Sequence, residues 1–175
     1  MVGKMTNESM SYSRSNIGGK AYNLLVLKEK KFLVPNFFVI PNNQIENLRF
    51  EDLSKKIINK IKDKKTEFII RSSAIEEDGS EHSFAGMFES ARIKDNSHIE
   101  EELKKVLKSS NSDKISFYLN SKKIKEKPRL SVIVQYFIEG DVSGVMFTSM
   151  IKDAKKGTLI NSNFGCSSVV DGSDV

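Results

Sequence analysis

Cysteine is nearly absent from this 175-residue chain, which contains only Cys166. A single thiol can form neither an intramolecular disulfide nor a thiolate metal site, so we interpret Cys166 as a small buried residue. Tryptophan is missing, and no apolar run approaches the length of a membrane span. The polar residues 1–16 lack the apolar core of a secretion signal. These absences predict a soluble, cytoplasmic protein that does not bind membranes.

The excess of positive charge is small. Lys and Arg number 28 against 23 Asp and Glu, which gives a formal net charge of +5. A basic chain can bind nucleic acid, but the interleaving of aromatic and basic residues that stacks bases is absent here. Most lysines stand beside glutamates in helix-like segments, which is typical of solvated helix faces. The sequence therefore favours a chain without a nucleic-acid partner.

The pattern of apolar residues predicts an α+β protein of one domain or two small lobes. Helices are predicted over 45–64, over 115–119, and behind a capping box formed by Ser97 and Glu100. The predicted strands are 32–41, 68–70, 90–93, 130–138, 142–148 and 158–161. The turn at 139–141 indicates a β-hairpin between 130–138 and 142–148.

The stretch from Glu67 to Glu89 offers two devices that suit phosphate groups. The first is Arg71 at the end of an apolar strand, because a guanidinium presents a rigid fork of donors to phosphate oxygens. The second is the small-residue loop Ser83–Gly86, which allows main-chain N–H groups to approach an anion. A phosphate-binding role for this stretch is the leading hypothesis.

The segment Gly18-Gly19-Lys20 precedes an apolar pattern that predicts a loop leading into a helix. A lysine at such a helix start could bind phosphate, because the helix N-terminus already favours an anion. The spacing alone favours the alternative, which is an exposed lysine in a turn.

Three separated segments, taken together, resemble the ATP-binding domain of the family of phosphoenolpyruvate synthase, pyruvate phosphate dikinase and rifampin phosphotransferase. The segments are Gly18–Leu24 with Val34–Ile40, Ile70–Ala74 with Ser83–Gly86, and Val134–Ile138 with Ser143–Thr148. They follow in the family's order across about residues 17–172 of the chain. The resemblance implies an ATP-grasp-like fold with a mixed or antiparallel sheet, in which ATP lies between two α+β lobes.

The resemblance also implies roles for particular residues. Lys20 and Arg71 would hold the ATP phosphates and serve catalysis, which favours Arg71 as a phosphate ligand over a structural ion pair with Glu76 or Asp78. The remaining nucleotide contacts would come from Ser83, Phe84, Ala85 and Gly86 over the phosphates, and from Gln135, Phe137 and Ile138 at the adenine, with Asp141 and Glu89 as weaker candidates.

The sequence departs from the family near its end. The family continues with Gly-Leu-Gly-Glu, whose Glu assists the metal, whereas residues 164–172 contain no Glu. We therefore expect Mg²⁺ as a cofactor without identifying its ligands, and neither His82 nor His98 matches a functional position. We interpret residues 1–16 as a flexible lead-in and 17–175 as the ATP-binding domain, truncated at its C-terminal end within a larger protein.

The function implied by the resemblance is phosphoryl transfer in a dikinase-type enzyme. Such an enzyme splits ATP into AMP and phosphate and passes a phosphoryl group through a phosphohistidine domain to a small-molecule acceptor, either pyruvate or another compound. The alternative is a non-catalytic nucleotide-binding or regulatory module that has lost its metal site.

Overall fold

The structure is a computed structural model that describes residues 12–61, 67–76, 84, 87–147 and 157–165. The chain divides into two compact units at the peptide bond between Phe137 and Ile138. The helices and strands of the first unit are α1 (Arg14–Glu29), β1 (Phe37–Ile40), α2 (Asn42–Glu46), α3 (Phe50–Lys60), β2 (Phe68–Ala74), β3 (Ser90–Ile93), α4 (Ile99–Lys108), α5 (Asp113–Ser121) and β4 (Leu130–Tyr136).

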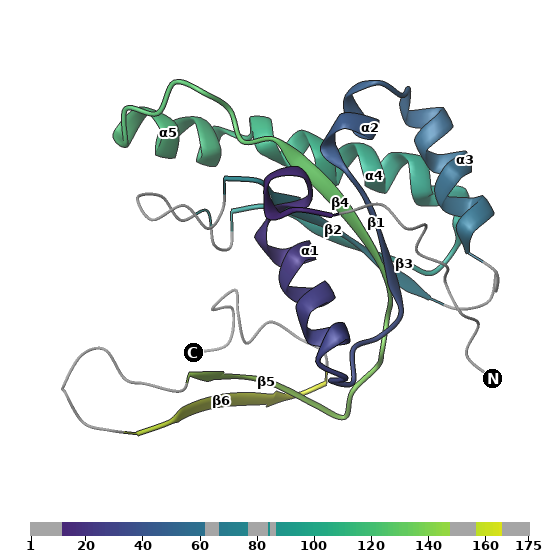
Figure 1. Ribbon diagram of the computed structural model, residues 1–175, viewed down its shortest axis with the longest axis vertical. Helices are drawn as coiled ribbons and strands as arrows, with labels where there is room; N and C mark the ends of the chain where they lie inside the picture. The colour runs from purple at the N-terminus through teal and green to yellow at the C-terminus, as the bar shows by residue number, and fades with distance from the viewer. Residues whose placement is uncertain (1–11, 62–66, 77–83, 85–86, 148–156, 166–175) are drawn as a thin grey trace. The chain divides into compact units, whose positions relative to one another are not determined.

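The first unit is built on a four-stranded antiparallel sheet with the strand order β1-β4-β2-β3. Figure 1 shows α1 in front of this sheet and α3 and α4 behind it. Since successive side chains of a strand point to opposite faces, each strand contributes to two separate layers. The predicted α+β class with an antiparallel sheet is confirmed.

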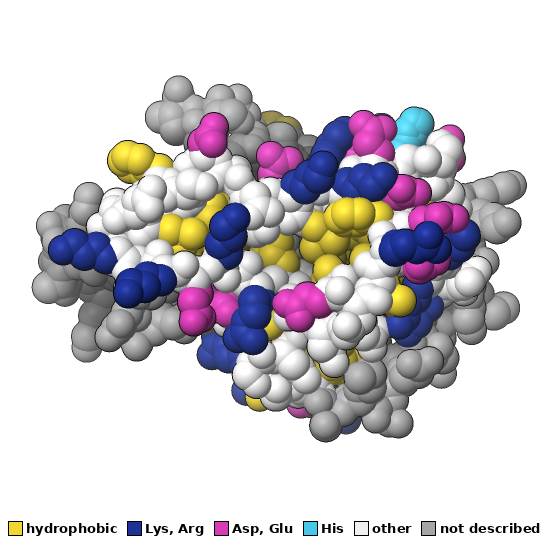
Figure 2. All heavy atoms as spheres, turned by 90° about the horizontal axis from the view of Figure 1, so that it is seen from above, with side chains coloured by type: hydrophobic (Ala, Val, Ile, Leu, Met, Phe, Trp, Pro, Cys, Tyr) yellow, Lys and Arg dark blue, Asp and Glu magenta, His cyan; other side chains and the backbone are white. Residues whose placement is uncertain are grey.

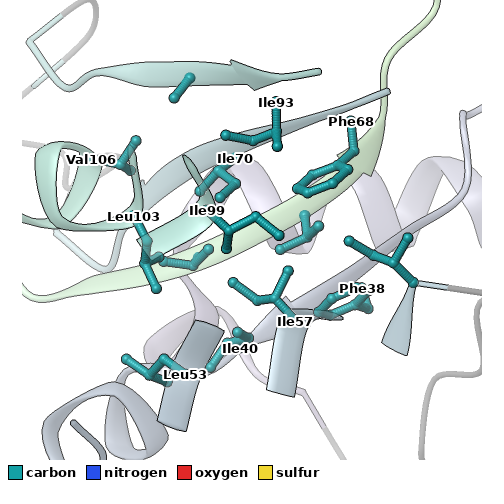
Figure 3. Packing of buried hydrophobic residues seen from close by; sticks show 14 of the residues in the cluster. Phe38, Ile40, Leu53, Ile57, Phe68, Ile70, Ile93, Ile99, Leu103 and Val106 are labelled. Carbon is teal, nitrogen blue, oxygen red and sulfur yellow. The ribbon is translucent and has the colours of Figure 1, made fainter. Parts of the chain in front are cut away.

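The layer behind the sheet is the main hydrophobic core. Even-numbered residues of β2 and β4 pack there against the apolar stripes of α3 and α4, and none of them is more than a few per cent exposed (Figure 3). The labelled members are Phe38, Ile40, Leu53, Ile57, Phe68, Ile70, Ile93, Ile99, Leu103 and Val106. The helical spacing that predicted these stripes is confirmed, and the burial of so many large side chains holds the sheet rigid.

The layer in front of the sheet is smaller and covers only part of it. Here α1 packs Ile17 and Ala21 against Phe37, Val39 and Ile133, which lie on β1 and β4. The same face of β2 and β3 presents polar and half-buried side chains, which are not members of this apolar cluster. The partial cover leaves a polar strip along β2 beside α1.

The second unit contains a β-hairpin of β5 (Val142–Phe147) and β6 (Leu159–Phe164). The predicted pairing of 130–138 with 142–148 is wrong, because β5 pairs with β6. The physical reason is that β4 lies in the middle of its sheet, with β1 and β2 occupying both of its edges.

Other element boundaries also differ from the predictions. The strand expected over 32–41 is confined to Phe37–Ile40, and the helix expected over 45–64 is divided into α2 and α3. The strand expected over 68–70 extends to Ala74. The predicted capping box at Ser97 is wrong, since the Asp95 carboxylate accepts a hydrogen bond from the Ser97 N–H at 3.0 Å and caps a 3₁₀ turn before α4.

The described part of the chain contains no helix with the length and apolar character that a membrane crossing requires.

Candidate functional site

Helix α1 is interrupted at Gly18, where two helical segments meet. Gly18 has φ 76° and ψ 167°, a backbone conformation that L side chains rarely adopt. A Cβ atom at this position would lie 2.5 Å from both the Ala74 carbonyl oxygen and the Ser73 Oγ. Glycine is therefore required here, because the chain must turn while pressed against the end of β2. Lys20 follows in the first turn of the second helical segment and is half-buried.

The start of this second segment is capped by β2. The Ser73 Oγ accepts a hydrogen bond from the Ala21 N–H at 3.1 Å, which satisfies one of the donors that a helix start leaves without a partner inside the helix. The Ser131 hydroxyl of β4 lies in hydrogen-bonding distance of the Ile17 and Ser73 carbonyl oxygens, at 3.1 Å from the latter. Ser73 and Ser131 are fully buried. Two serine hydroxyls thus join three segments that are far apart in the sequence.

Arg71 lies on the same face of β2 as Ser73 and is half-buried. Its Nη1 donates to the Gln135 Oε1 of β4 at 3.4 Å, and the Gln135 Nε2 donates to the Pro35 carbonyl oxygen at the same distance. Both are long hydrogen bonds and therefore weak ones. The Gln135 side chain is thus a weak, uncharged neighbour of the Arg71 guanidinium.

The main chain after Gln135 is partly engaged. The Tyr136 N–H donates to the Asn36 carbonyl oxygen at 2.9 Å, and the Phe137 N–H donates to the Glu67 carbonyl oxygen at 3.0 Å. Both donors therefore already serve the first unit. The N–H groups of Tyr136 and Phe137 are therefore not available to an adenine edge.

Arg92 and Glu67 are members of the strip that the sequence predictions missed. The Arg92 Nε and Nη2 lie 2.6 and 2.5 Å from the Glu67 Oε2, and the Arg92 Cζ lies 3.9 Å from the centroid of the Phe137 ring. The available signal was the alternation along β3, where Ala91 and Ile93 are buried and Arg92 must point to the opposite face.

The polar strip therefore runs along one face of β2. Ser73 marks the end beside the helix segment that carries Lys20, Arg71 lies in the middle, and Glu67 marks the end beside Phe137. Ile69 lies between Gln135 and Arg92 in the ladder, so its half-buried side chain is an apolar surface in this strip. We call this set of residues the β2 strip.

The small-residue loop is described only at Phe84, since Ser83, Ala85 and Gly86 lie outside the described residues. Phe84 is 2% exposed and packs against Tyr118 at 5.1 Å and Phe88 at 5.8 Å between ring centroids. The Phe84 side chain is thus a core anchor, and only its main chain could meet a ligand.

The weaker candidates lie at other places. Glu89 is exposed, and its main chain contacts the hydroxyls of Ser72 and Ser109, each at 3.4 Å. Asp141 is exposed in the second unit, where its carbonyl oxygen accepts the Gly165 N–H at 2.8 Å.

The described member of the acidic run, Glu76, has a partner other than Arg71. Its carboxylate accepts hydrogen bonds from the Arg129 Nε and main-chain N–H, each at 2.9 Å. The hydrogen bond to Glu76 raises the pKa of Arg129 above its ordinary value. Glu76 therefore ties β2 to the start of β4, and Glu77 and Asp78 lie outside the described residues.

A cavity of about 360 Å³ lies on the other side of the sheet, beside α2, α3 and the end of α4. Its lining is mixed and includes the apolar Leu53, Leu107 and Leu130 together with the charged Lys127 and Arg129. Figure 2, a view from above Figure 1, shows hydrophobic side chains in a hollow flanked by charged ones. Several polar groups in this lining already have partners within the protein, since Lys127 donates to Asn111, Arg129 pairs with Glu76 and Asn42 donates to the Leu130 carbonyl oxygen.

Comparison with known families identifies the domain. A family model described as the AMP/ATP-binding domain of pyruvate phosphate dikinase matches residues 49–174. The chain belongs to this family. The predicted resemblance is confirmed, and the match includes Arg71 and Gln135. It begins after Lys20, so the placement of Lys20 beside the β2 strip rests on the bonds of Ser73 and Ser131. A search of curated proteins found no match.

The described residues of this dikinase-family domain were also considered as metal ligands. Among residues 12–61, 67–76, 84, 87–147 and 157–165, no group of three or more His, Cys, Asp or Glu side chains is placed to hold a metal ion. Mg²⁺ remains an expected cofactor whose ligands are not identified among these residues.

Proposed function

We propose that this chain binds ATP along the β2 strip, with the phosphates at Lys20 and Arg71 and the adenine near Phe137 and Ile138. The observation that carries the proposal is the buried junction of Ser73, Ser131 and Ala21, which attaches the helical segment that carries Lys20 to β2 and β4. Membership of a family of AMP/ATP-binding domains supports the choice of ligand.

The phosphate end combines two sources of positive potential. Arg71 supplies a planar fork of donors that suits phosphate oxygens, and its Gln135 partner is a neutral amide that can be displaced at little cost. Lys20 supplies a second cation in the first turn of a helical segment, where the helix dipole also favours an anion. Their half-buried positions strengthen both interactions, because the field is less screened than at an exposed surface.

The adenine end offers an apolar surface and main-chain groups. Ile69 is half-buried on this face, and its apolar side chain suits the flat surface of a base. The Phe137 ring lies beneath the Arg92 guanidinium. The Phe137 carbonyl and the Ile138 main chain are the groups we propose for the adenine edge. Main-chain recognition of this kind would leave the side chain of Gln135 to orient Arg71.

The full function that we propose is phosphoryl transfer in a dikinase-type enzyme. In such an enzyme ATP would yield AMP and phosphate, and a phosphohistidine domain of the same protein would pass the phosphoryl group to a small-molecule acceptor. The β2 strip would position the triphosphate and neutralise its charge, which supplies most of the catalysis in phosphoryl transfer. No step is assigned to Mg²⁺, because its ligands are not identified among the described residues.

Isothermal titration of the chain with ATP tests the binding proposal. We expect Arg71→Ala to weaken ATP binding by about 10- to 100-fold, since hydrogen bonds to charged groups contribute about 1.5–3 kcal/mol. Lys20→Ala should weaken ATP more than AMP, because its contact is to the outer phosphates. Absence of ATP binding, with or without Mg²⁺, would contradict the proposal.

Matched control variants are available on the far side of the sheet. Arg49 and Lys55 are exposed residues of the α3 region that pair with Asp52 and Glu51. Arg49→Ala and Lys55→Ala remove the same charges as the test variants and should leave ATP binding unchanged. Release of AMP and phosphate from ATP would then separate a transfer domain from a domain that only binds nucleotide.

A further inference from the structure

The Arg92 guanidinium has a fixed position although Arg92 lies on an edge strand. Two of its guanidinium nitrogens converge on one carboxylate oxygen of Glu67, at 2.6 and 2.5 Å. The two side chains are 27% and 34% exposed, so their ion pair is partly shielded from solvent. Short contacts to a partly shielded carboxylate fix the plane of the guanidinium, because its donors have a rigid geometry.

The fixed guanidinium covers the ring of Phe137. The Arg92 Cζ lies 3.9 Å from the ring centroid, well inside the range of a cation–π contact. The main chain of Phe137 is also attached to Glu67, through the hydrogen bond from its N–H at 3.0 Å. Glu67 thus holds Phe137 in two ways, directly by its carbonyl oxygen and indirectly through Arg92.

These contacts occur at the boundary between the two compact units of the chain. Phe137 is the last residue of the first unit, and Ile138 begins the second. The ladder places Arg92 opposite Ile69, and its guanidinium extends toward Glu67 and Phe137, the end of the β2 strip away from Ser73. Arg92 therefore belongs to the adenine end and adds little to the positive charge at the phosphate end.

We infer that Arg92 is a positioning residue that sets base selectivity, an inference that rests on the proposed function. By fixing the ring and main chain of Phe137 through Glu67, Arg92 fixes the Phe137 carbonyl that would contact the adenine edge. Adenine and guanine present different patterns of hydrogen-bond donors and acceptors. Selection between the two bases therefore requires that the protein groups facing the base are held in fixed positions. The inference adds Arg92 and Glu67 to the set of residues on which nucleotide recognition depends.

Binding of ATP, GTP and tripolyphosphate by the 175-residue chain and its variants tests this inference. Arg92→Gln and Glu67→Gln should each weaken ATP binding by about three- to tenfold, the range expected for loss of a cation–π contact and its support. The preference for ATP over GTP should fall by a similar factor. Tripolyphosphate has no base, so its binding should remain within about twofold for Glu67→Gln.

Glu67→Gln is the sharper variant because electrostatics alone predicts the opposite result. Removal of a carboxylate makes the strip more positive, which by itself would strengthen the binding of any nucleotide polyanion. Weaker ATP binding by Glu67→Gln, with tripolyphosphate unchanged or tighter, therefore supports a positioning role. Phe137→Leu keeps an apolar side chain, removes the ring and should lower the ATP-to-GTP preference in the same way.

The outcomes separate the two proposals. Failure of the unmodified chain to bind ATP overturns the proposed function and this inference together. Normal ATP binding by the unmodified chain, with an unchanged ATP-to-GTP preference in folded Glu67→Gln and Phe137→Leu, overturns this inference alone. Arg49→Gln, which breaks the exposed ion pair with Asp52 on the other side of the sheet, should alter neither quantity.

Discussion

The Ser73 hydroxyl caps Ala21 from a different part of the chain, accepting its main-chain N–H at 3.1 Å in a buried position. Ser73→Ala should lower the free energy of unfolding by about 1–2 kcal/mol, because a helix start then loses its acceptor in a buried place. It should also weaken ATP binding, although Ser73 itself is covered, because the segment that carries Lys20 loses its attachment. Urea unfolding and isothermal titration measure the two effects.

Ser121 provides the comparison for this substitution. Its hydroxyl donates to the Tyr118 carbonyl oxygen at 2.8 Å at the exposed end of α5. Ser121→Ala should change stability by no more than about 0.5 kcal/mol, as is usual for exposed positions. Equal effects of Ser73→Ala and Ser121→Ala on the free energy of unfolding would show that the buried cap stabilises the fold no more than an exposed serine does.

At Gly18 the addition of a single methyl group should strongly destabilise the fold. An alanine Cβ would lie 2.5 Å from the Ala74 carbonyl oxygen, and φ would remain at 76°. Gly18→Ala should therefore destabilise the chain by about 2 kcal/mol or more, from backbone strain together with displacement of β2 from α1. Thermal unfolding followed by circular dichroism measures the loss.

Gly157→Ala is the matched control, since a Cβ there meets no atom within 4 Å and the backbone needs no positive φ. Its melting temperature should stay close to that of the unmodified chain. A similar loss for both substitutions would contradict the assigned role of Gly18.

Glu76 should contribute to stability and leave nucleotide binding unaffected. Its carboxylate pairs with Arg129, whose side chain is 57% exposed, so the ion pair is screened by solvent. Glu76→Gln should cost no more than about 1 kcal/mol of unfolding free energy, with the loss shrinking in high salt. ATP affinity should be unchanged, in contrast with the loss expected for Arg71→Ala. A drop in ATP affinity for Glu76→Gln, measured by titration at one salt concentration, would instead tie Glu76 to the site.

Much of the fold could be predicted because it follows from local patterns of apolar and polar residues. The apolar stripes of α3 and α4 and the β-branched run of β4 are visible in sequence, and the structure confirms them. The motifs around Arg71 and Gln135 were sufficient for the family, which the family model confirms. Local patterns predict helices and strands because the buried residues of an amphipathic element recur with a fixed period, which differs between helices and strands.

The unpredicted features all depend on contacts between distant residues. Nothing near Val142 indicates that both edges of β4 are taken by other strands, so the hairpin was assigned to the wrong partner. The attachment of Arg92 to Glu67 and Phe137 requires knowledge of the strand order. The cap at Asp95 was missed because Ser97 and Glu100 also fit the pattern, and the two candidate caps are only two residues apart.

The Asp95 cap predicts a specific dependence of stability on pH. The Ser97 N–H and side chain donate to the carboxylate and lower the pKa of Asp95 below its ordinary value of 3.8. A lowered pKa in the folded state means that the charged form stabilises the fold above pH 3.8 and that this contribution is lost as the pH falls through the lowered value. Asp95→Asn keeps an accepting oxygen and removes the charge. The difference in unfolding free energy between the unmodified chain and Asp95→Asn should therefore be constant near neutral pH and shrink in acid. A difference that stays the same from neutral pH to pH 2 would mean that the charge of Asp95 plays no part in starting the turn before α4.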